Sequence, residues 1–250
     1  MSDIYGKHNA NHFDENSGHG ILKSISEAHR FLSWTVEVIE PYLGRKILEV
    51  GSGIGNVSQY ISKRERLILT DIDPIYLDIL RSNFSNIENI SITKLDLNDD
   101  LDFTALGDGV VDTIICLNVL EHIEYDVAAL KRMSKLLVPG GHIILLVPQY
   151  EFLFGSFDSI VEHYRRYTKH ALKKTVISSG LIPIKFINFN FLPIFGWWLN
   201  GVVLKRKQMD HWQIKIFDML VPLLKFIERI LPLPGLSLIC IAEKKSTSLE

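Results

Sequence analysis

Cysteine, net charge and long apolar runs are all scarce in this chain of 250 residues. Its two cysteines, Cys116 and Cys240, each lie inside an apolar run, which favours buried thiols in a reducing compartment over a disulfide framework. The formal net charge is −2, so nothing attracts the chain as a whole to nucleic acid, and we expect no nucleic-acid partner. Residues 1–20 are polar and lack the apolar segment of a signal peptide, which favours a cytoplasmic protein.

What the chain does contain is a regular alternation of apolar strands and amphipathic helices. Apolar residues recur at helical spacing over 21–43, and strands then alternate with helices from Lys46–Val50 onward. We expect a helix over 56–63, a fifth strand over 142–148, and Asp73 and Thr168 as N-caps of two later helices. Near-continuous apolar strands of this kind are typical of a mostly parallel sheet that helices cover on both faces. The pattern therefore predicts an α/β, Rossmann-like fold.

Three glycines at alternate positions, Gly51, Gly53 and Gly55, follow the first strand. Glycines there allow a tight turn, the approach of a ligand to the backbone, and a helix that starts close to the sheet. The dinucleotide fingerprint would require Gly or Ala at position 56, where this chain has Asn56. Asp71, at the end of the second strand, is suited to accept hydrogen bonds from two ribose hydroxyls, which fits either kind of nucleoside cofactor.

Five motifs in register carry a family resemblance, and they read ILEVGSGIG, LTDIDP, KLDLND, IICLNVLEHI and LLVPGGHIILLVP. In order and spacing they resemble the class I S-adenosylmethionine-dependent methyltransferases, and the group labelled type 11 or 12 is most similar. The resemblance covers residues 46–148. It implies a seven-stranded, mostly parallel sheet with an antiparallel last strand, S-adenosylmethionine as cofactor and S-adenosylhomocysteine as product.

The resemblance also implies which residues bind the cofactor. Glu49 and the first glycines would hold its methionine part, Asp71 its ribose and Asp96 the adenine amino group. The full set that it implies is Glu49, Gly51, Gly53, Gly55, Asp71, Ile72, Asp96, Leu97, Asn118 and Val119. These motifs contain no fixed catalytic residue in the family. A sulfonium methyl group is already a strong electrophile, so holding a nucleophile in line with it supplies much of the rate.

The loop after the fifth strand contains the segment EHYRRYT, at the same sheet edge as the cofactor. Related methyltransferases beside polysaccharide- and lipid-processing enzymes look similar here. We expect a small-molecule or lipid- or saccharide-linked acceptor that is methylated at oxygen, with nitrogen and carbon as alternatives. Guanidinium groups suit a carboxylate or phosphate on such an acceptor. We predict four acceptor contacts: Tyr164, Arg165, Arg166 and Tyr167. The alternative is that the arginines pair with acidic neighbours such as Glu162 and hold the loop shut.

Two histidines are candidates for the base that would take a proton from an acceptor hydroxyl, namely His163 and His122. His122 is also suited to shape the cofactor pocket. The other histidines, which include His8, His12 and His19, lack cysteine or carboxylate partners at metal-ligand spacing. We therefore predict no metal.

An insertion of roughly 45 residues separates the last two strands, far more than the usual loop. Its first half, Phe191–Leu204, is too short to span a bilayer, which takes about 20 residues. Its second half predicts an amphipathic helix, Ile214–Leu231, with Lys215, Lys225 and Arg229 on the polar stripe. We predict a lid and docking surface for an apolar acceptor. Contact with the inner face of a membrane, packing on the domain, and a homodimer all remain open.

These features divide the chain into four segments. They are an N-terminal segment and helix that could fold over the cofactor (1–45), the methyltransferase core (46–190), the insertion (191–234) and the final strand (235–245). Two rival functions remain. One is a non-catalytic S-adenosylmethionine-binding or membrane-edge interaction protein, and the other is an NAD-dependent oxidoreductase.

Overall fold

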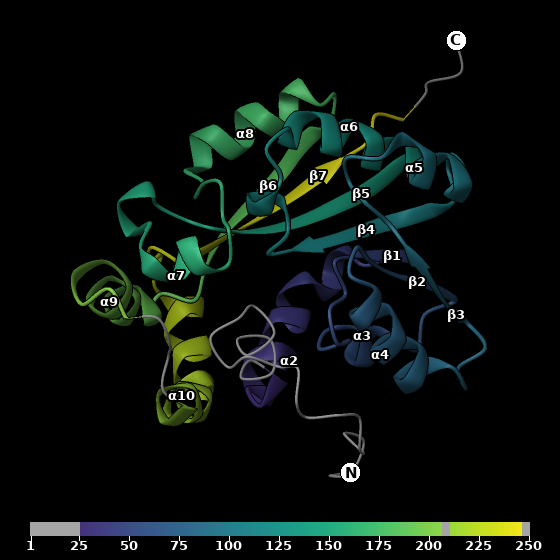
Figure 1. Ribbon diagram of the computed structural model, residues 1–250. Helices are drawn as coiled ribbons and strands as arrows, with labels where there is room; N and C mark the ends of the chain where they lie inside the picture. The colour runs from purple at the N-terminus through teal and green to yellow at the C-terminus, as the bar shows by residue number, and fades with distance from the viewer. Residues whose placement is uncertain (1–25, 207–210, 247–250) are drawn as a thin grey trace.

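Apolar runs pair as the strands of a seven-stranded sheet in the order β3-β2-β1-β4-β5-β7-β6 (Figure 1). The computed structural model describes residues 26–206 and 211–246. Residues 1–25 of the N-terminal segment that was predicted to fold over the cofactor, which include His8, His12 and His19, lie outside the described residues. Strand β7 runs antiparallel to both of its neighbours, while the other pairs are parallel. The predicted α/β sheet with an antiparallel last strand is therefore confirmed.

Strand bounds agree with the sequence pattern except at β5. The strands are β1 Lys46–Val50, β2 Arg66–Asp71, β3 Ile90–Lys94, β4 Val111–Leu117, β5 Leu137–Pro148, β6 Ile182–Phe189 and β7 Ser237–Glu243. Strand β5 begins earlier than expected and includes Pro139-Gly140-Gly141. The register with β4 shifts there, because Val111 pairs with Leu137 whereas Thr113 pairs with His142. The extra residues form an irregularity of the kind that breaks strand periodicity.

Helices cover both faces of the sheet (Figure 1). They are α2 His29–Ile39, α3 Ser58–Ile61, α4 Pro74–Phe84, α5 Asp100–Leu106, α6 Asp126–Leu136, α7 Ser156–Ile160, α8 Lys169–Ser178, α9 Pro193–Trp197 and α10 His211–Ile230. Two predicted caps are confirmed: Asp73 Oδ1 accepts from the Ile75 amide at 2.8 Å, and Thr168 Oγ1 accepts from the Ala171 amide at 3.1 Å. Helix α3 is shorter than predicted, because turns occupy residues 53–57.

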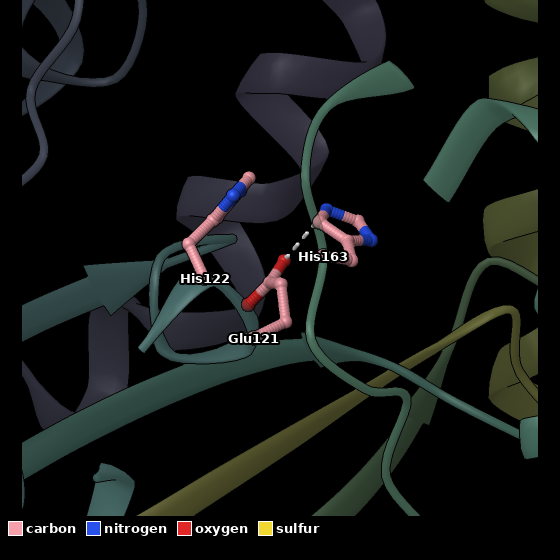
Figure 2. A group of neighbouring side chains, drawn as sticks. All are labelled: Glu121, His122 and His163. Carbon is pink, nitrogen blue, oxygen red and sulfur yellow. Dashed lines mark ion pairs between the residues drawn. The ribbon is translucent and has the colours of Figure 1, made fainter. Parts of the chain in front are cut away.

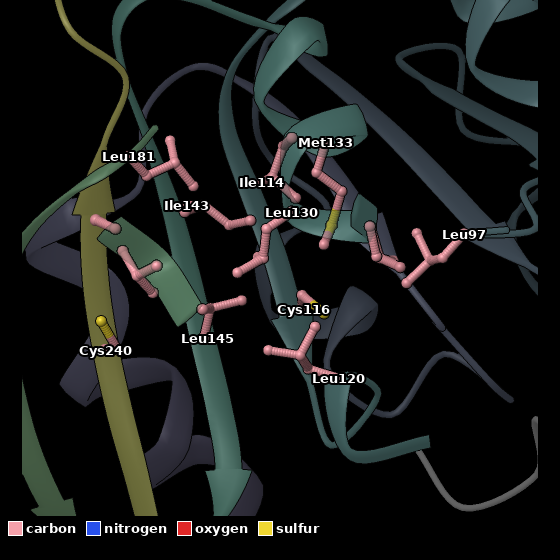
Figure 3. Close-up of a cluster of buried hydrophobic side chains, with 14 of the residues drawn as sticks. Leu97, Ile114, Cys116, Leu120, Leu130, Met133, Ile143, Leu145, Leu181 and Cys240 are labelled. Carbon is pink, nitrogen blue, oxygen red and sulfur yellow. The ribbon is translucent and has the colours of Figure 1, made fainter. Parts of the chain in front are cut away.

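Short helical turns join these elements. They are η1 Glu40–Tyr42, η2 Leu120–His122, η3 Glu151–Leu153 and the π-helical η4 Trp198–Val203. Helices α5, α6 and α8 cover one face of the sheet, and α2, α3, α4 and α10 cover the other. Both cysteines lie in the hydrophobic core between the sheet and helices α5, α6 and α8 (Figure 3), and both are free thiols. Burial raises the pKa of Cys240 to about 12 and raises that of Cys116 as well.

The insertion contains α9, η4 and α10, and its polar stripe faces the domain. Asp218 Oδ1 accepts from the Phe31 amide of α2 at 2.9 Å, and Lys225 forms an ion pair with Glu37 of α2. Glu228 accepts from the amides that follow β6, Asn190 at 3.1 Å and Phe191 at 2.8 Å. These charges bind backbone and side chains of the core, which leaves an apolar stripe of α10 on the outside.

That outer stripe consists of large exposed side chains at alternate spacings of four and three residues. Its members are Trp212, Ile216, Met219, Leu223, Phe226 and Ile230. Within the described residues, no helix is both long enough and apolar enough to cross a membrane. The stripe therefore lies along the surface of the protein.

Candidate functional site

The glycine turn after β1 is held in a conformation that suits glycine. Gly51, Gly53 and Gly55 have φ values of +67°, +55° and +88°, in the region that side chains disfavour. A Cβ atom on Gly51 would also lie 2.4 Å from Cγ2 of Val119, and one on Gly55 would lie 2.6 Å from the Phe84 ring. The turn thus lies directly against the loop after β4, and its helix start packs on α4.

Asp71 ties this turn to the end of β2. Its Oδ2 accepts from the Gly53 amide at 2.8 Å, and its Oδ1 accepts from the Asp73 amide at 3.0 Å. The side chain is buried, and this burial raises its pKa. Each carboxylate oxygen can accept a further hydrogen bond. The group therefore shapes the turn while keeping the capacity to bind a hydroxyl.

Glu49 places a second carboxylate beneath the turn. It is buried, and its Oε2 accepts from Ser58 Oγ at 2.5 Å. Burial raises the pKa of Glu49 to about 7, and the negative charge of Asp71 adds to that rise. A cationic group that approached this carboxylate would favour its ionised form.

The remaining predicted cofactor residues follow the ends of β2, β3 and β4. Ile72 is 56% exposed, so its side chain is available to an aromatic ring. Asp96 Oδ1 accepts from the Asn98 amide at 2.8 Å, whereas the Leu97 side chain is buried in the core. Asn118 has a φ of +53° and donates its amide to Leu146. Because β3, β2, β1 and β4 are adjacent and parallel, these residues meet at one edge of the sheet.

Next to this edge, folding brings together Glu121, His122 and His163 (Figure 2). The first two lie in η2 after β4, and His163 lies in the loop after α7. The Nε2 atom of His163 lies 3.8 Å from Oε1 of Glu121, and the two imidazole rings are 4.6 Å apart at their centroids. Asp158 Oδ1 lies 2.8 Å from Nδ1 of His163. The backbone amide of Tyr164 also donates to the Glu121 carbonyl at 2.8 Å, which fixes the loop to η2.

Burial controls the ionisation of this cluster. It raises the pKa of Glu121 to about 8 and, together with the neighbouring His163, lowers that of His122 to about 4. Burial acts to raise the pKa of Asp158 too, but hydrogen bonds and charge from His163 and Arg166 hold it below its usual range. His122 is therefore neutral at physiological pH and is a weak base.

Arg166 and Tyr167 are buried, which corrects the prediction that they contact an acceptor. Arg166 Nε donates to Asp158 at 2.8 Å and its Nη1 donates to the Gln149 carbonyl at 3.1 Å. The Tyr167 hydroxyl donates to Asp126 at 2.8 Å. These polar groups are used inside the protein, so the alternative that the arginines hold the loop is the better description. Their acidic partners are Asp158 and Asp126 instead of Glu162.

Arg165 and Tyr164 are more accessible than their neighbours. Arg165 donates to the Glu124 carbonyl at 2.7 Å and to Asp126 at 3.3 Å, so its guanidinium group also has partners within the protein. Tyr164 is 57% exposed. Together with His122, Glu162 and His163 it lines a cavity of about 400 Å³. Of the four predicted acceptor contacts, Tyr164 is the one that lines this polar pocket.

Glu121 and Asp158 are the two residues to which the sequence interpretation assigned no role. Glu121 lies within the motif IICLNVLEHI, and Asp158 lies in α7, five residues before His163. Their spacing in the sequence suggests nothing, because the two carboxyl groups come near His163 only through the packing of the loop after α7 on η2. The side chains of both are fully buried.

A second, apolar cavity of about 500 Å³ lies beside α7. It is lined by Phe152, Leu153, Phe191, Leu192, Ile194, Phe195 and Trp198. Trp197, in α9, connects it to the polar cluster, since its Nε1 donates to Asp158 at 3.4 Å and its ring lies 4.8 Å from the Arg166 guanidinium carbon. The insertion thus contacts the charged network through one side chain.

Residues 48–143 match a family model that is described as a methyltransferase domain. The ubiquinone biosynthesis O-methyltransferase of Acinetobacter baumannii is 27% identical over 116 residues, which are 45% of this chain and 47% of that protein. This chain therefore spans about half the length of that curated relative. The residues that match the family model include the glycine turn, Asp71, Asp96 and the segment with Glu121 and His122.

Two solved structures share the fold over most of the chain. A SAM-dependent methyltransferase from Archaeoglobus fulgidus superposes with a TM-score of 0.60 at 17% identity, over 91% of this chain and 100% of that one. The [4+2]-cyclase SpnF superposes with a TM-score of 0.57 at 14% identity, over 87% of this chain and 81% of that one. At such identities the likeness shows the fold alone.

Asp158→Asn tests whether the buried ion pair holds the loop. We expect the free energy of unfolding to fall by about 3–5 kcal/mol, because the buried Arg166 loses its counter-charge. Glu162→Gln, which changes an exposed acid of the same loop, should stay within about 0.5 kcal/mol of the wild type. Urea denaturation measures both. Equal losses in the two variants would contradict the assignment of Asp158 as the partner.

Proposed function

We propose that this chain, whose core is a class I S-adenosylmethionine-dependent methyltransferase domain, transfers a methyl group to an oxygen of a small-molecule or lipid-linked acceptor. The observation that carries the proposal is the single sheet edge on which the glycine turn and Asp71 meet a pocket lined by His122 and His163. A nucleoside cofactor on the turn would present its reactive end to that pocket.

The residues of the edge fit the cofactor. S-adenosylmethionine supplies a methyl group on a positively charged sulfur and also carries a cationic amino group. The turn at Gly51 and Gly53 carries no side chains at these two positions, so a ligand could approach its backbone there. Buried Glu49 has a carboxylate that an ammonium group would stabilise, and Asp71 can accept from ribose hydroxyls. Ile72 would cover the adenine.

Rival functions differ in what they predict at this edge. An NAD-dependent oxidoreductase would need a small residue where the chain has Asn56, which is buried. A binding protein without turnover would not need a pocket beside the cofactor, yet a cavity of about 400 Å³ opens there. His163 is the base that we propose for an acceptor hydroxyl, because its Nε2 is directed away from the Asp158 bond.

Calorimetric titration tests the cofactor. S-adenosylhomocysteine should bind and NAD should not. Asp71→Asn should weaken binding by about 10- to 100-fold, because hydrogen bonds to a charged group contribute about 1.5–3 kcal/mol each. Asp78→Asn, which changes an exposed acid of α4, is the matched control and should leave affinity unchanged. Binding of NAD without S-adenosylhomocysteine would overturn the proposal.

The pH dependence of this binding tests Glu49. Its pKa of about 7 means that it is mostly protonated at pH 6 in the free protein. An ammonium group beside it requires the ionised form, so binding releases a proton below pH 7. Affinity should therefore rise by up to about tenfold from pH 6 to pH 8 and then level off. Glu49→Gln should abolish that rise. A wild-type affinity that is flat across this range would contradict the role of Glu49.

The acceptor that we propose has an apolar portion. The aromatic cavity of Phe152, Phe195 and Trp198 lies beside α7, and Trp197 joins it to the Asp158 cluster. One molecule could thus bind its apolar part in this cavity and its hydroxyl near His163. The insertion would then serve as the lid and docking surface of the acceptor.

The outer stripe of α10 supports a further part of the proposal, a peripheral contact with an anionic lipid surface. Lys215, which lies 3.8 Å from the Glu27 carboxylate, and Arg229 border the stripe. The acids Asp218 and Glu228 instead bind backbone amides of the core. A second copy packed antiparallel on the stripe would place Lys215 of one copy near Arg229 of the other, and like charges repel. An apolar face with Trp212 and a basic border suits anionic headgroups instead.

Sedimentation with phosphatidylglycerol vesicles tests this contact. We expect the wild type to sediment and Leu223→Asp/Phe226→Asp to remain in the supernatant. The control Leu101→Asp/Ile177→Asp adds the same charge at exposed apolar sites of α5 and α8 and should sediment. If both variants bind vesicles like the wild type, the stripe is not the contact. If analytical ultracentrifugation finds a dimer that only the α10 variant loses, a second copy covers the stripe instead.

A further inference from the structure

The cluster of Glu121, His122 and His163 has the composition of a metal site. One ligand atom from each residue, a carboxylate oxygen or an imidazole nitrogen, lies within 4.8 Å of the other two (Figure 2). We propose that these three residues bind a divalent transition-metal cation, of which Zn²⁺ and Mn²⁺ are the best matches to two imidazoles and one carboxylate.

The distances are compatible with a shared ion. A divalent cation holds nitrogen and oxygen ligands at about 2.0–2.2 Å, so two of its ligand atoms lie at most about 4.4 Å apart. Glu121 Oε1 and His163 Nε2 are already within that limit at 3.8 Å. The ligand nitrogen of His122 lies within 4.8 Å of the other two ligand atoms, so a small side-chain rotation would be needed to bring it into range.

Glu121 supplies an independent reason to expect a cation. Its side chain is fully buried, and among the described residues neither carboxylate oxygen accepts a hydrogen bond. Buried carboxylates are normally paired, hydrogen-bonded or bound to a metal, because desolvation is costly. Asp158 and Arg166 pair with each other at 2.8 Å, which leaves Glu121 as the carboxyl group of the cluster without a hydrogen-bond partner among the described residues.

The contact that holds the His163 ring is also typical of a histidine that binds a metal. Asp158 Oδ1 lies 2.8 Å from Nδ1 of His163, which fixes the ring and turns Nε2 toward Glu121. Metal-binding histidines commonly donate their other ring nitrogen to a carboxylate in this way. The sequence predicted no metal, because His163 is distant in sequence from His122 and only the loop after α7 brings them together.

A cation here would leave coordination positions open to the cavity that His122, His163 and Tyr164 line. Its catalytic role, which rests on the proposed function, would be to bind the acceptor hydroxyl and lower its pKa. Because a bound cation would occupy Nε2 of His163, that ring would not act as the base in the metal-bound form, and the hydroxyl proton would pass to water. An oxygen lone pair would then form the new O–CH₃ bond. The S–CH₃ bond breaks with its electron pair left on sulfur, which departs as the neutral thioether.

Titration of chelator-treated full-length protein with Co²⁺ alone tests the site. We expect one equivalent to bind and to give the visible absorption of coordinated cobalt. Glu121→Gln and His122→Asn should each weaken binding at least about tenfold. Glu124→Gln and His170→Ala change exposed residues nearby and should leave it intact. Thermal unfolding verifies that each variant is folded.

Two outcomes would overturn the site. One is the absence of bound cobalt in the wild type, and the other is equal binding in all four variants, which would mean an adventitious ion only. Because the assay contains neither S-adenosylmethionine nor acceptor, its failure leaves the proposed function standing. Loss of S-adenosylhomocysteine binding, conversely, would leave the cobalt result intact.

Discussion

A single buried carboxylate, Asp158, organises the side of the molecule where we propose that the acceptor binds. It accepts from Arg166, binds the ring of His163 and receives the indole N–H of Trp197. The pair with Arg166 closes the loop after α7 over η2, and only in that closed form does His163 reach Glu121. Because Trp197 belongs to the insertion, the same carboxylate also connects the aromatic cavity to the polar pocket.

The cofactor side depends on a different constraint, the common direction of four neighbouring strands. Parallel strands end at one edge, so the residues after β1, β2, β3 and β4 meet without any long-range contact of their own. Asp71 then closes the glycine turn through the Gly53 amide. The two sides meet at η2, which follows β4 directly and brings Glu121 and His122 to the loop of His163.

Local pattern was sufficient to predict the alternation of strands and helices and the caps Asp73 and Thr168, because these depend on neighbouring residues. The antiparallel last strand was implied by the family resemblance instead, since its pairing joins segments that are distant in sequence. It could not identify the partners of Arg166 or Glu121, since those contacts join η2, α7 and a loop that are separate in sequence. Helix α10 was predicted correctly as amphipathic. Which stripe faces inward was not evident, because Asp218 and Glu228 bind backbone amides that only the fold supplies.

The central claim is that one edge of the sheet presents a methyl donor to the pocket of His122 and His163. A crystal structure of the protein with S-adenosylhomocysteine tests it most directly. The account predicts ribose hydroxyls on Asp71, the amino group near Glu49, and the sulfur directed at the pocket that both histidines line. A ligand bound elsewhere, or bound at the glycine turn with its sulfur directed away from that pocket, would contradict it.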